Sequence, residues 1–279
     1  MNQRQKTFNV VGFLALLVLA VLWLVPLGIV LINSLKSNLY VSKEPFALPN
    51  ADSFSAAYNY VSGVNRTGFW SAAALSLFIT VCSVAVIVLV TSMTAWYIAR
   101  VKAWYTSLLY YMFVFSMIVP FQMVMFTMSK VANVTGLDNP VGIIILYTGF
   151  GAGLSVFICT GFVRGIPVDI EEAAMIDGAP MWRVFFSVIF PVLRPTVVTI
   201  AILNAMWIWN DYLLPLLVIG SDYKTIPIAV QQYMTGSYGA KDYGGFMAML
   251  VLAIIPIIVA YLFGQRYIIK GVAAGAVKG

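Results

Sequence analysis

Six long apolar stretches constrain this chain more than any other feature of its sequence. They lie at about residues 10–32, 69–97, 104–128, 140–163, 196–219 and 244–265, and Asp211 is the one charged residue inside them. Because the hydrocarbon core of a bilayer needs roughly 20 apolar residues per helix, each stretch predicts a membrane-spanning helix. Charged residues make up 9% of the 279 residues, whereas a soluble domain has about one quarter. The sequence therefore predicts an all-α membrane protein, with six transmembrane helices in a single domain over residues 1–279.

The basic residues are distributed unevenly between the segments that connect these stretches. With the N terminus placed inside, ten of the sixteen fall on the cytoplasmic side: Arg4, Lys6, Arg100, Lys102, Arg164, Arg183, Arg194, Arg266, Lys270 and Lys278. Cytoplasmic loops carry an excess of Lys and Arg, so both termini are predicted to be cytoplasmic. This distribution also accounts for the net charge of +6 without a nucleic-acid partner. The first stretch is too long for a signal peptide and lacks a small-residue cleavage site, which predicts a retained helix.

The chain lacks the residues that most catalytic and metal sites require. It has no histidine, and Cys82 and Cys159 lie inside apolar stretches, where a small hydrophobic role is ordinary. The sequence contains no nucleophile–base pair and no G-x-x-x-x-G-K-[ST] phosphate-binding loop. We therefore expect no catalytic residue, no metal ligand and no cofactor in this chain.

The longest predicted cytoplasmic connection, residues 164–195, reads RGIPVDIEEAAMIDGAPMWRVFFSVIFPVLRP. Pro167 suits the first position of a helix, and three acids follow in the first turn, where the helix dipole favours negative charge. Gly178 suits the end of that helix. Small side chains recur at helical spacing between Ile170 and Asp177. Either another protein approaches this face closely, or the helix lies on its own bundle.

The loop resembles the EAA loop found in permease subunits of binding-protein-dependent ABC importers. That pattern is Glu-Ala-Ala, three residues, Gly, nine residues and Ile-x-Leu-Pro. The matching residues are Glu172, Ala173, Ala174, Gly178 and Pro191, with Val188 and Phe190 replacing the Ile and Leu. In that family the loop is a coupling helix held in a groove of a separate ATPase, which binds ATP and magnesium. The resemblance implies an ATPase-coupling surface formed by Glu171, Glu172, Ala173, Ala174, Asp177, Gly178 and Pro191.

The resemblance covers nearly the whole chain. The segments WIWNDYLLPLL at 207–217, IVPFQ at 118–122 and GAVKG at 275–279 are similar to the carbohydrate-uptake branch of the family, which includes permeases of maltose importers. It implies the MetI-like fold of a type I importer permease in the cytoplasmic (inner) membrane of a bacterium. The implied partners are membrane lipid, a second homologous permease, two ATPase subunits, an extracytoplasmic sugar-binding protein and a sugar, expected to be an oligosaccharide. The alternatives are an ABC importer of a non-sugar solute and an ion-coupled secondary transporter that uses Asp211.

A polar and aromatic stripe in the fifth stretch is a candidate for the translocation pathway. Asn204, Trp207 and Asp211 are spaced three and four apart and so share one helical face, with Asn210 beside them. A carboxylate near the bilayer centre costs ~2.5–3.5 kcal/mol, so Asp211 should face protein or water. Pro215 leaves the Asp211 carbonyl without its usual amide partner. The stripe either contacts substrate or forms an interhelical hydrogen bond that holds a kink.

Prolines lie inside several of the predicted spans, at Pro26, Pro120, Pro215 and Pro256. Each removes a backbone donor, so each predicts a kink. Near Pro120, Gln122 is a further pathway candidate, although Met and Phe residues such as those around it more often serve packing.

Overall fold

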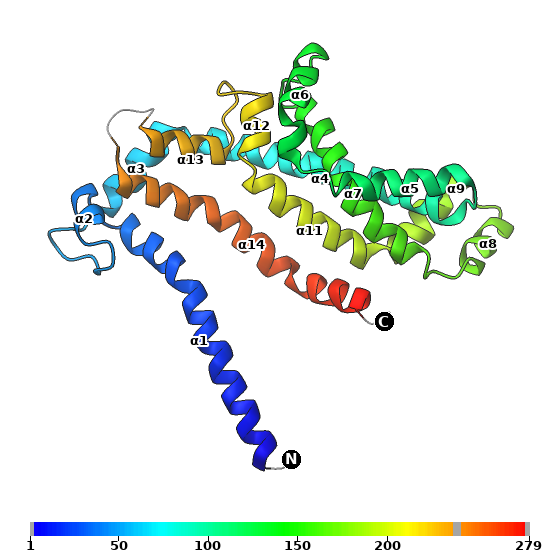
Figure 1. The fold of residues 1–279 in the computed structure, drawn as a ribbon, viewed down its shortest axis with the longest axis horizontal. Helices are drawn as coiled ribbons and strands as arrows, with labels where there is room; N and C mark the ends of the chain where they lie inside the picture. The colour runs from blue at the N-terminus through cyan, green and yellow to red at the C-terminus, as the bar shows by residue number, and fades with distance from the viewer. Residues whose placement is uncertain (1–2, 237–240, 277–279) are drawn as a thin grey trace. The chain divides into compact units, whose positions relative to one another are not determined.

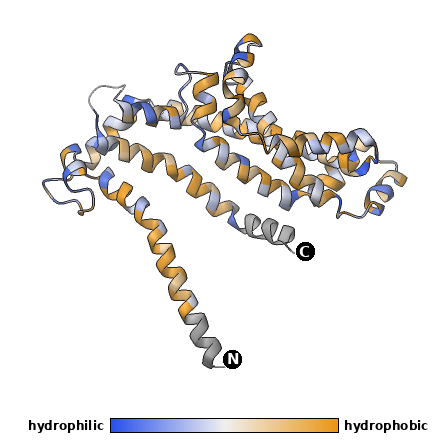
Figure 2. Cartoon of the chain, in the orientation of Figure 1, coloured by the Kyte–Doolittle hydropathy of each residue, from blue (hydrophilic) through white to orange (hydrophobic). Residues whose placement is uncertain are grey.

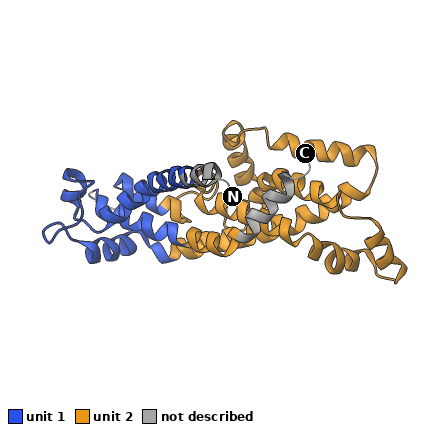
Figure 3. Cartoon of the chain, turned by 90° about the horizontal axis from the view of Figure 1, so that it is seen from below, with its two compact units in different colours: residues 1–70, 229–255 blue, residues 71–228, 256–279 orange. Residues whose placement is uncertain are grey.

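The helices of this chain fall into two compact units (Figure 3), which we describe separately. The computed structural model describes the backbone of residues 3–236 and 241–276, and the side chains of residues 11–236 and 241–265. Unit 1 comprises residues 1–70 and 229–255, and unit 2 comprises residues 71–228 and 256–279. Over the described residues the regular structure is helical, apart from one isolated antiparallel bridge between Lys36 and Phe54.

Unit 1 contains the N-terminal helix, two short helices and parts of the last two helices (Figure 1). These are α1 (Gln3–Ser34), α2 (Asn38–Lys43), α3 (Ala56–Thr67), most of α13 (Ile226–Thr235) and the first part of α14 (Tyr243–Ala276).

Unit 2 contains the remaining helices of the chain. These are α4 (Phe69–Arg100), α5 (Trp104–Ser116), α6 (Phe121–Val134), α7 (Gly142–Val163), α8 (Asp169–Ile176), α9 (Met181–Arg183), the π-helix η1 (Val184–Ile189), α10 (Phe190–Val192), α11 (Arg194–Asn210) and α12 (Leu213–Val218). The beginning of α13 and the rest of α14 also belong to it.

Four helices are long and apolar enough to cross a membrane among the described residues. They are α4, α7, residues 11–34 of α1 and residues 243–265 of α14, and Figure 2 shows the apolar colour along α1. Two further pairs pass the same test but are bent: α5 with α6, by 105°, and residues 181–192 with α11, by 77°. Counting each bent pair as one span gives up to six, the number that the sequence predicts, although the second pair covers residues 181–210 and not the predicted residues 196–219.

Two of the predicted spans are not continuous helices. In the third, α5 ends at Ser116 and α6 begins only after Pro120, because proline disfavours the α conformation in the preceding residue and has no N–H to donate. In the fifth, α11 ends at Asn210 and α12 begins at Leu213. Pro215 then occupies the first turn of a new helix, where its missing N–H costs nothing. At Pro26 and Pro256, by contrast, α1 and α14 continue as helix.

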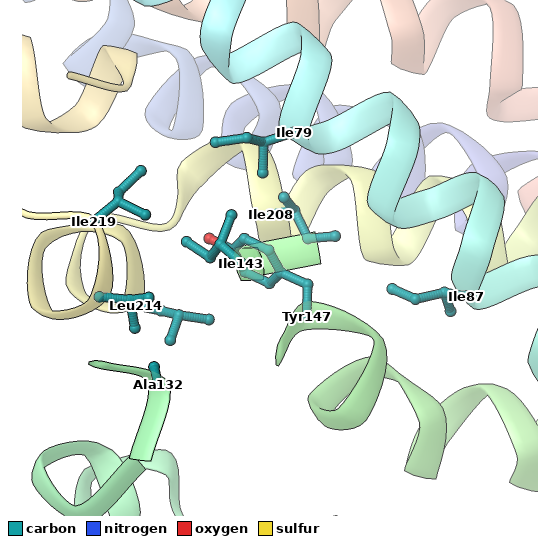
Figure 4. Close-up of a cluster of buried hydrophobic side chains, with 9 residues drawn as sticks. Ile79, Ile87, Ala132, Ile143, Tyr147, Ile208, Leu214 and Ile219 are labelled. Atoms are coloured by element: carbon teal, nitrogen blue, oxygen red, sulfur yellow. The ribbon is translucent and has the colours of Figure 1, made fainter. Parts of the chain in front are cut away.

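The main core of unit 2 lies between α4, α6, α7, α11 and α12 (Figure 4). Its buried residues are Ile79, Ile87, Ala132, Ile143, Tyr147, Ile208, Leu214, Val218 and Ile219. Glycine lets α7 and α5 pack closely, since a Cβ on Gly153 would lie 2.8 Å from the Phe113 carbonyl oxygen. Small residues at such contacts are typical of helix packing in membranes.

Buried polar groups contribute to holding unit 1 together. Lys36 is 1% exposed, and its ammonium group donates to the Glu44 carbonyl at 2.8 Å. The Asn59 side-chain amide donates to the Lys36 carbonyl at 2.7 Å. The Tyr233 hydroxyl donates to a carboxylate oxygen of Asp242 at 2.9 Å. The first two bonds hold the segment after α1 together and join it to α3, and the third joins α13 to the residue that precedes α14.

Candidate functional site

The short helix α8 has well-defined ends that its sequence explains. It begins at Asp169, so Pro167 precedes the helix instead of occupying its first position as predicted. At the other end, Gly178 has a φ of +81°, a conformation that glycine adopts without a steric cost. The N–H of Gly178 donates to the Met175 carbonyl and the N–H of Ala179 to the Ala174 carbonyl, both at 3.0 Å. This is a Schellman motif, and it confirms that Gly178 ends the helix.

Glu171 fixes α8 to the end of α4. Its side chain is buried, with 4% exposed, and one carboxylate oxygen accepts the Nε–H of Arg100 at 2.7 Å. The other oxygen accepts the indole N–H of Trp96 at 2.9 Å. Arg100 also donates to the Ile166 carbonyl at 3.0 Å, just before α8. The structure therefore corrects the placement of Glu171 on an exposed coupling surface, because its carboxylate balances a basic side chain of the bundle.

Packing continues this anchored face of α8. Ala174, three residues after Glu171, packs against a buried cluster formed by Val163, Ile166, Val184, Phe185, Ile189 and Leu193. The Trp96 ring lies 5.5 Å from the Phe185 ring and so joins the polar anchor to this cluster. Trp96 and Arg100 were not predicted as site residues. The only signal in the sequence was a basic residue at the end of a span.

The opposite face of α8 is open. Four of the predicted coupling residues are exposed there: Glu172, Ala173, Asp177 and Gly178. Apolar side chains accompany them, including Ile176, which is 85% exposed, and Trp182 in the following helix, which is 62% exposed. One face of α8 therefore lies on its own bundle, and the other face is exposed.

Pro191 lies outside α8, in the helical segment of residues 181–192. This segment contains the π-helix η1, in which the N–H of Phe190 donates to the Phe185 carbonyl five residues earlier. Proline cannot donate to the carbonyl four residues before it and crowds that carbonyl, and a π turn widens the helix at that point. Because η1 packs against α8, Pro191 lies in the segment that supports α8 and is not part of the exposed face of α8.

The break after α11 is organised by Asp211. One carboxylate oxygen accepts the N–H of Leu213 at 3.0 Å and that of Leu214 at 3.4 Å, which caps α12. The other accepts the hydroxyl of Tyr147 on α7 at 3.1 Å. The expectation that Asp211 shares a helical face with Asn204 and Trp207 is wrong, because the helix ends before Asp211.

The other pathway candidates lie in different surroundings. Asn204 is buried, and its amide donates to the Ser155 hydroxyl at 3.1 Å. Trp207 packs edge-on against Tyr147 at 5.4 Å and is 39% exposed. Asn210 and Gln122 are both exposed, and Asn210 donates to a carbonyl of its own helix. The structure thus brings Asp211 and Trp207 together around Tyr147, which the sequence analysis missed. Asn204, one turn before Trp207 in α11, is hydrogen-bonded to Ser155 instead.

The described part of the chain is thus an all-helical bundle with helices long and apolar enough to cross a membrane, one of which is joined to the short acidic helix α8 by an ion pair. Residues 87–274 match the family model "Binding-protein-dependent transport system inner membrane component", and the chain belongs to this family. AmyC of Thermoanaerobacterium thermosulfurigenes, described as a permease protein for starch degradation products, is 36% identical over 94% of both chains. MsmG of Streptococcus mutans, a permease protein of a multiple sugar-binding transport system, is 32% identical over the full length of both chains. A chain of a bacterial ABC transporter that imports alginate has the same fold, with a TM-score of 0.80 and 23% identity over 96% of this chain and 98% of that one.

Family membership decides several of the predictions. It confirms the predicted family and the multi-pass location in the inner membrane. The chain is therefore a transport subunit and not an enzyme, and its family has no cofactors. It also sets aside an ion-coupled secondary transporter that uses Asp211, since transport in this family depends on a binding protein.

Proposed function

We propose that this chain is one of two homologous permease subunits of an ATP-driven importer of carbohydrates, with oligosaccharides as substrates. The substrate class rests on the relatives, because starch degradation products, multiple sugars and alginate are the solutes named for them. The other partners are two ATPase subunits and an extracytoplasmic sugar-binding protein. The excess of basic residues supports placing α8 and both termini in the cytoplasm; residues 1–2 and 277–279 lie outside the described part of the chain.

The observation that carries this proposal is the two-sided character of α8. A charged hydrogen-bonded pair holds its inner face to Arg100, the last residue of the 32-residue helix α4. Its outer face presents acidic, small and apolar side chains, which suit close contact with another protein. A partner that moves α8 therefore also moves the end of a helix long enough to cross the membrane.

This arrangement supports a mechanism without catalytic groups in the permease. ATP binding closes the ATPase pair, the coupling helices of the two permeases follow, and the bundle changes from an inward-open to an outward-open state. ATP hydrolysis reverses the change. A partner shifts such an equilibrium only if it binds the two states with different affinity. The link between α8 and α4 lets the ATPase make that distinction, because it transmits the position of α8 to the end of α4.

We assign the pathway candidates two different roles. Asp211 and Asn204 hold helices in place, because both are engaged with α7. Trp207, Asn210 and Gln122 keep exposed surface and are the candidates for contact with sugar, since sugars offer C–H faces to aromatic rings and hydroxyl groups to amides.

Site-directed crosslinking tests the coupling assignment. A single cysteine at Asp177, in a chain whose two native cysteines are replaced by alanine, should crosslink to the co-expressed ATPase subunit. A cysteine at Arg194, which is also exposed, provides the matched control and should not. The proposal fails if position 177 never reaches the ATPase, or if that position reacts with a membrane-impermeant reagent from outside intact cells. Stimulation of ATPase activity by binding proteins loaded with different solutes tests the carbohydrate assignment separately.

A further inference from the structure

A cavity of about 550 Å³ lies in unit 2 where helices α4, α5 and α7 come together at their ends. Its walls are the last turn of α4, the link of residues 101–103, the first turn of α5 and Arg164, which follows α7. The volume is in the range of roughly 300–1,000 Å³ that is typical of small-molecule sites. The transport mechanism proposed above does not involve this cavity.

The cavity has an uncompensated positive charge. Lys102 and Arg164 line it, and none of its lining residues is acidic. The Arg164 guanidinium lies 5.0 Å from the centre of the Tyr110 ring, a cation–π contact that positions the group without neutralising it. The neighbouring Arg100 is already paired with Glu171. The first turn of α5 adds to the positive potential, because its N-terminal end carries a partial positive charge.

The surroundings of the cavity are those of a membrane–water boundary. Helices α4 and α7 are each long and apolar enough to span a bilayer, and they end at Arg100 and Val163 beside it. Trp104 at its rim is 78% exposed, and tryptophan is enriched where a span meets the headgroups. Basic pockets between spanning helices suit anionic headgroups.

An apolar stripe leads away from the cavity along α5. Starting from Trp104, it continues through residues spaced three to four apart, so that they share one face of the helix. These residues are Leu108, Tyr111, Met112 and Phe115, and they are 51%, 67%, 60% and 64% exposed. A free anion in the cavity would not contact this stripe, whereas the acyl chains attached to a bound headgroup would lie along it.

We infer that this cavity binds the phosphate of an anionic phospholipid headgroup, with the acyl chains of that lipid along α5. Such a lipid contacts Lys102 after α4 and Arg164 after α7 and so links the ends of these two helices. The coupling segment begins after α7 and is bonded to the end of α4. The inference concerns the lipid around the protein and holds for any transported solute.

Native mass spectrometry of the purified importer complex tests this inference. With equimolar phosphatidylglycerol and phosphatidylcholine, the unaltered protein should retain phosphatidylglycerol preferentially. Lys102→Gln and Arg164→Gln should each weaken that retention by about five-fold, and the double variant by about 25-fold, because a basic residue near an anionic surface contributes about that factor. Arg194→Gln removes an exposed basic residue outside the cavity and should leave retention unchanged. Lys102→Arg and Arg164→Lys keep the charge and should also retain the lipid, which separates loss of binding from misfolding.

Three results would overturn the inference. The first is equal retention of the two lipids by the unaltered protein. The second is a double variant that keeps as much phosphatidylglycerol as the Arg194→Gln control. The third is displacement of the lipid by soluble glycerol phosphate at the same concentration, because the site would then recognise a free phosphate ester and not a lipid.

Discussion

Replacing Glu171 tests how α8 is held to the bundle. Breaking a buried ion pair by removing one partner costs ~3–5 kcal/mol. The Arg100 side chain keeps 17% of its surface exposed, and that of Glu171 keeps 5%, so water partly solvates the charge left behind and we expect about 2–3 kcal/mol for Glu171→Ala. Glu171→Gln keeps the size of the side chain and one acceptor for Trp96. It exchanges a charged hydrogen bond for a neutral one, which costs about 1–2 kcal/mol.

Hydrogen exchange of the α8 amides measures this loss directly. A cost of 1–2 kcal/mol corresponds to opening that is roughly 5–30 times more frequent, and amides 172–177 should exchange faster by that factor in Glu171→Gln. The matched control is Glu172→Gln, because this neighbouring residue is exposed and the change should alter exchange by no more than about two-fold. The control should instead weaken coupling to the ATPase.

A double-mutant cycle with Arg100→Gln completes the test. If the two residues form one unit, the double variant should be less destabilised than the sum of the single variants, by about 0.5–3 kcal/mol. Exchange in Glu171→Gln as slow as in the unaltered protein, or additive effects of the two changes, would refute the anchored-helix account.

Further predictions concern the helix break, the turn after α8 and alkaline pH. Asp211→Ala should lower the midpoint of thermal unfolding by removing the cap of α12, worth about 1 kcal/mol, whereas Asn210→Ala should leave it nearly unchanged. Gly178→Val places a branched side chain at positive φ, at a cost of about 1–2 kcal/mol, and should leave ATP hydrolysis running while transport stops; Gly161→Ala, at a helical position with open space around it, should transport normally. Burial, together with a neighbouring carboxylate, raises the pKa of Tyr233 from 10.0 to about 12. The folded state therefore favours the neutral phenol, and this contribution to stability is complete below pH 10 and is lost as the pH rises towards 12. Melting curves between pH 8 and about 12 should show this alkaline loss in the unaltered protein, and a smaller one in Tyr233→Phe.

The sequence alone predicted the features that depend on local composition. In lipid, a single long apolar stretch is stable as a helix, because the backbone donors of a helix find their acceptors within the same stretch. The stretches therefore indicated where the long helices lie, although two of the stretches contain a break. The resemblance of residues 172–191 to a known loop indicated the family. The end of α8 was equally local, since a Schellman turn needs a residue that tolerates positive φ.

What the tertiary structure decided is which face of each helix meets a neighbour. Glu171 and Glu172 are adjacent acids of identical chemistry, yet the first is buried against Arg100 and the second is exposed. Asp211 was recognisable as an unusual charge, but its partner Tyr147 lies 64 residues earlier in the chain. Successive residues of a helix point about 100° apart, so the sequence fixes their relative directions. The absolute orientation of these residues depends on how helices distant in sequence pack. That packing determines that Glu171 pairs with Arg100 and that Glu172 stays exposed.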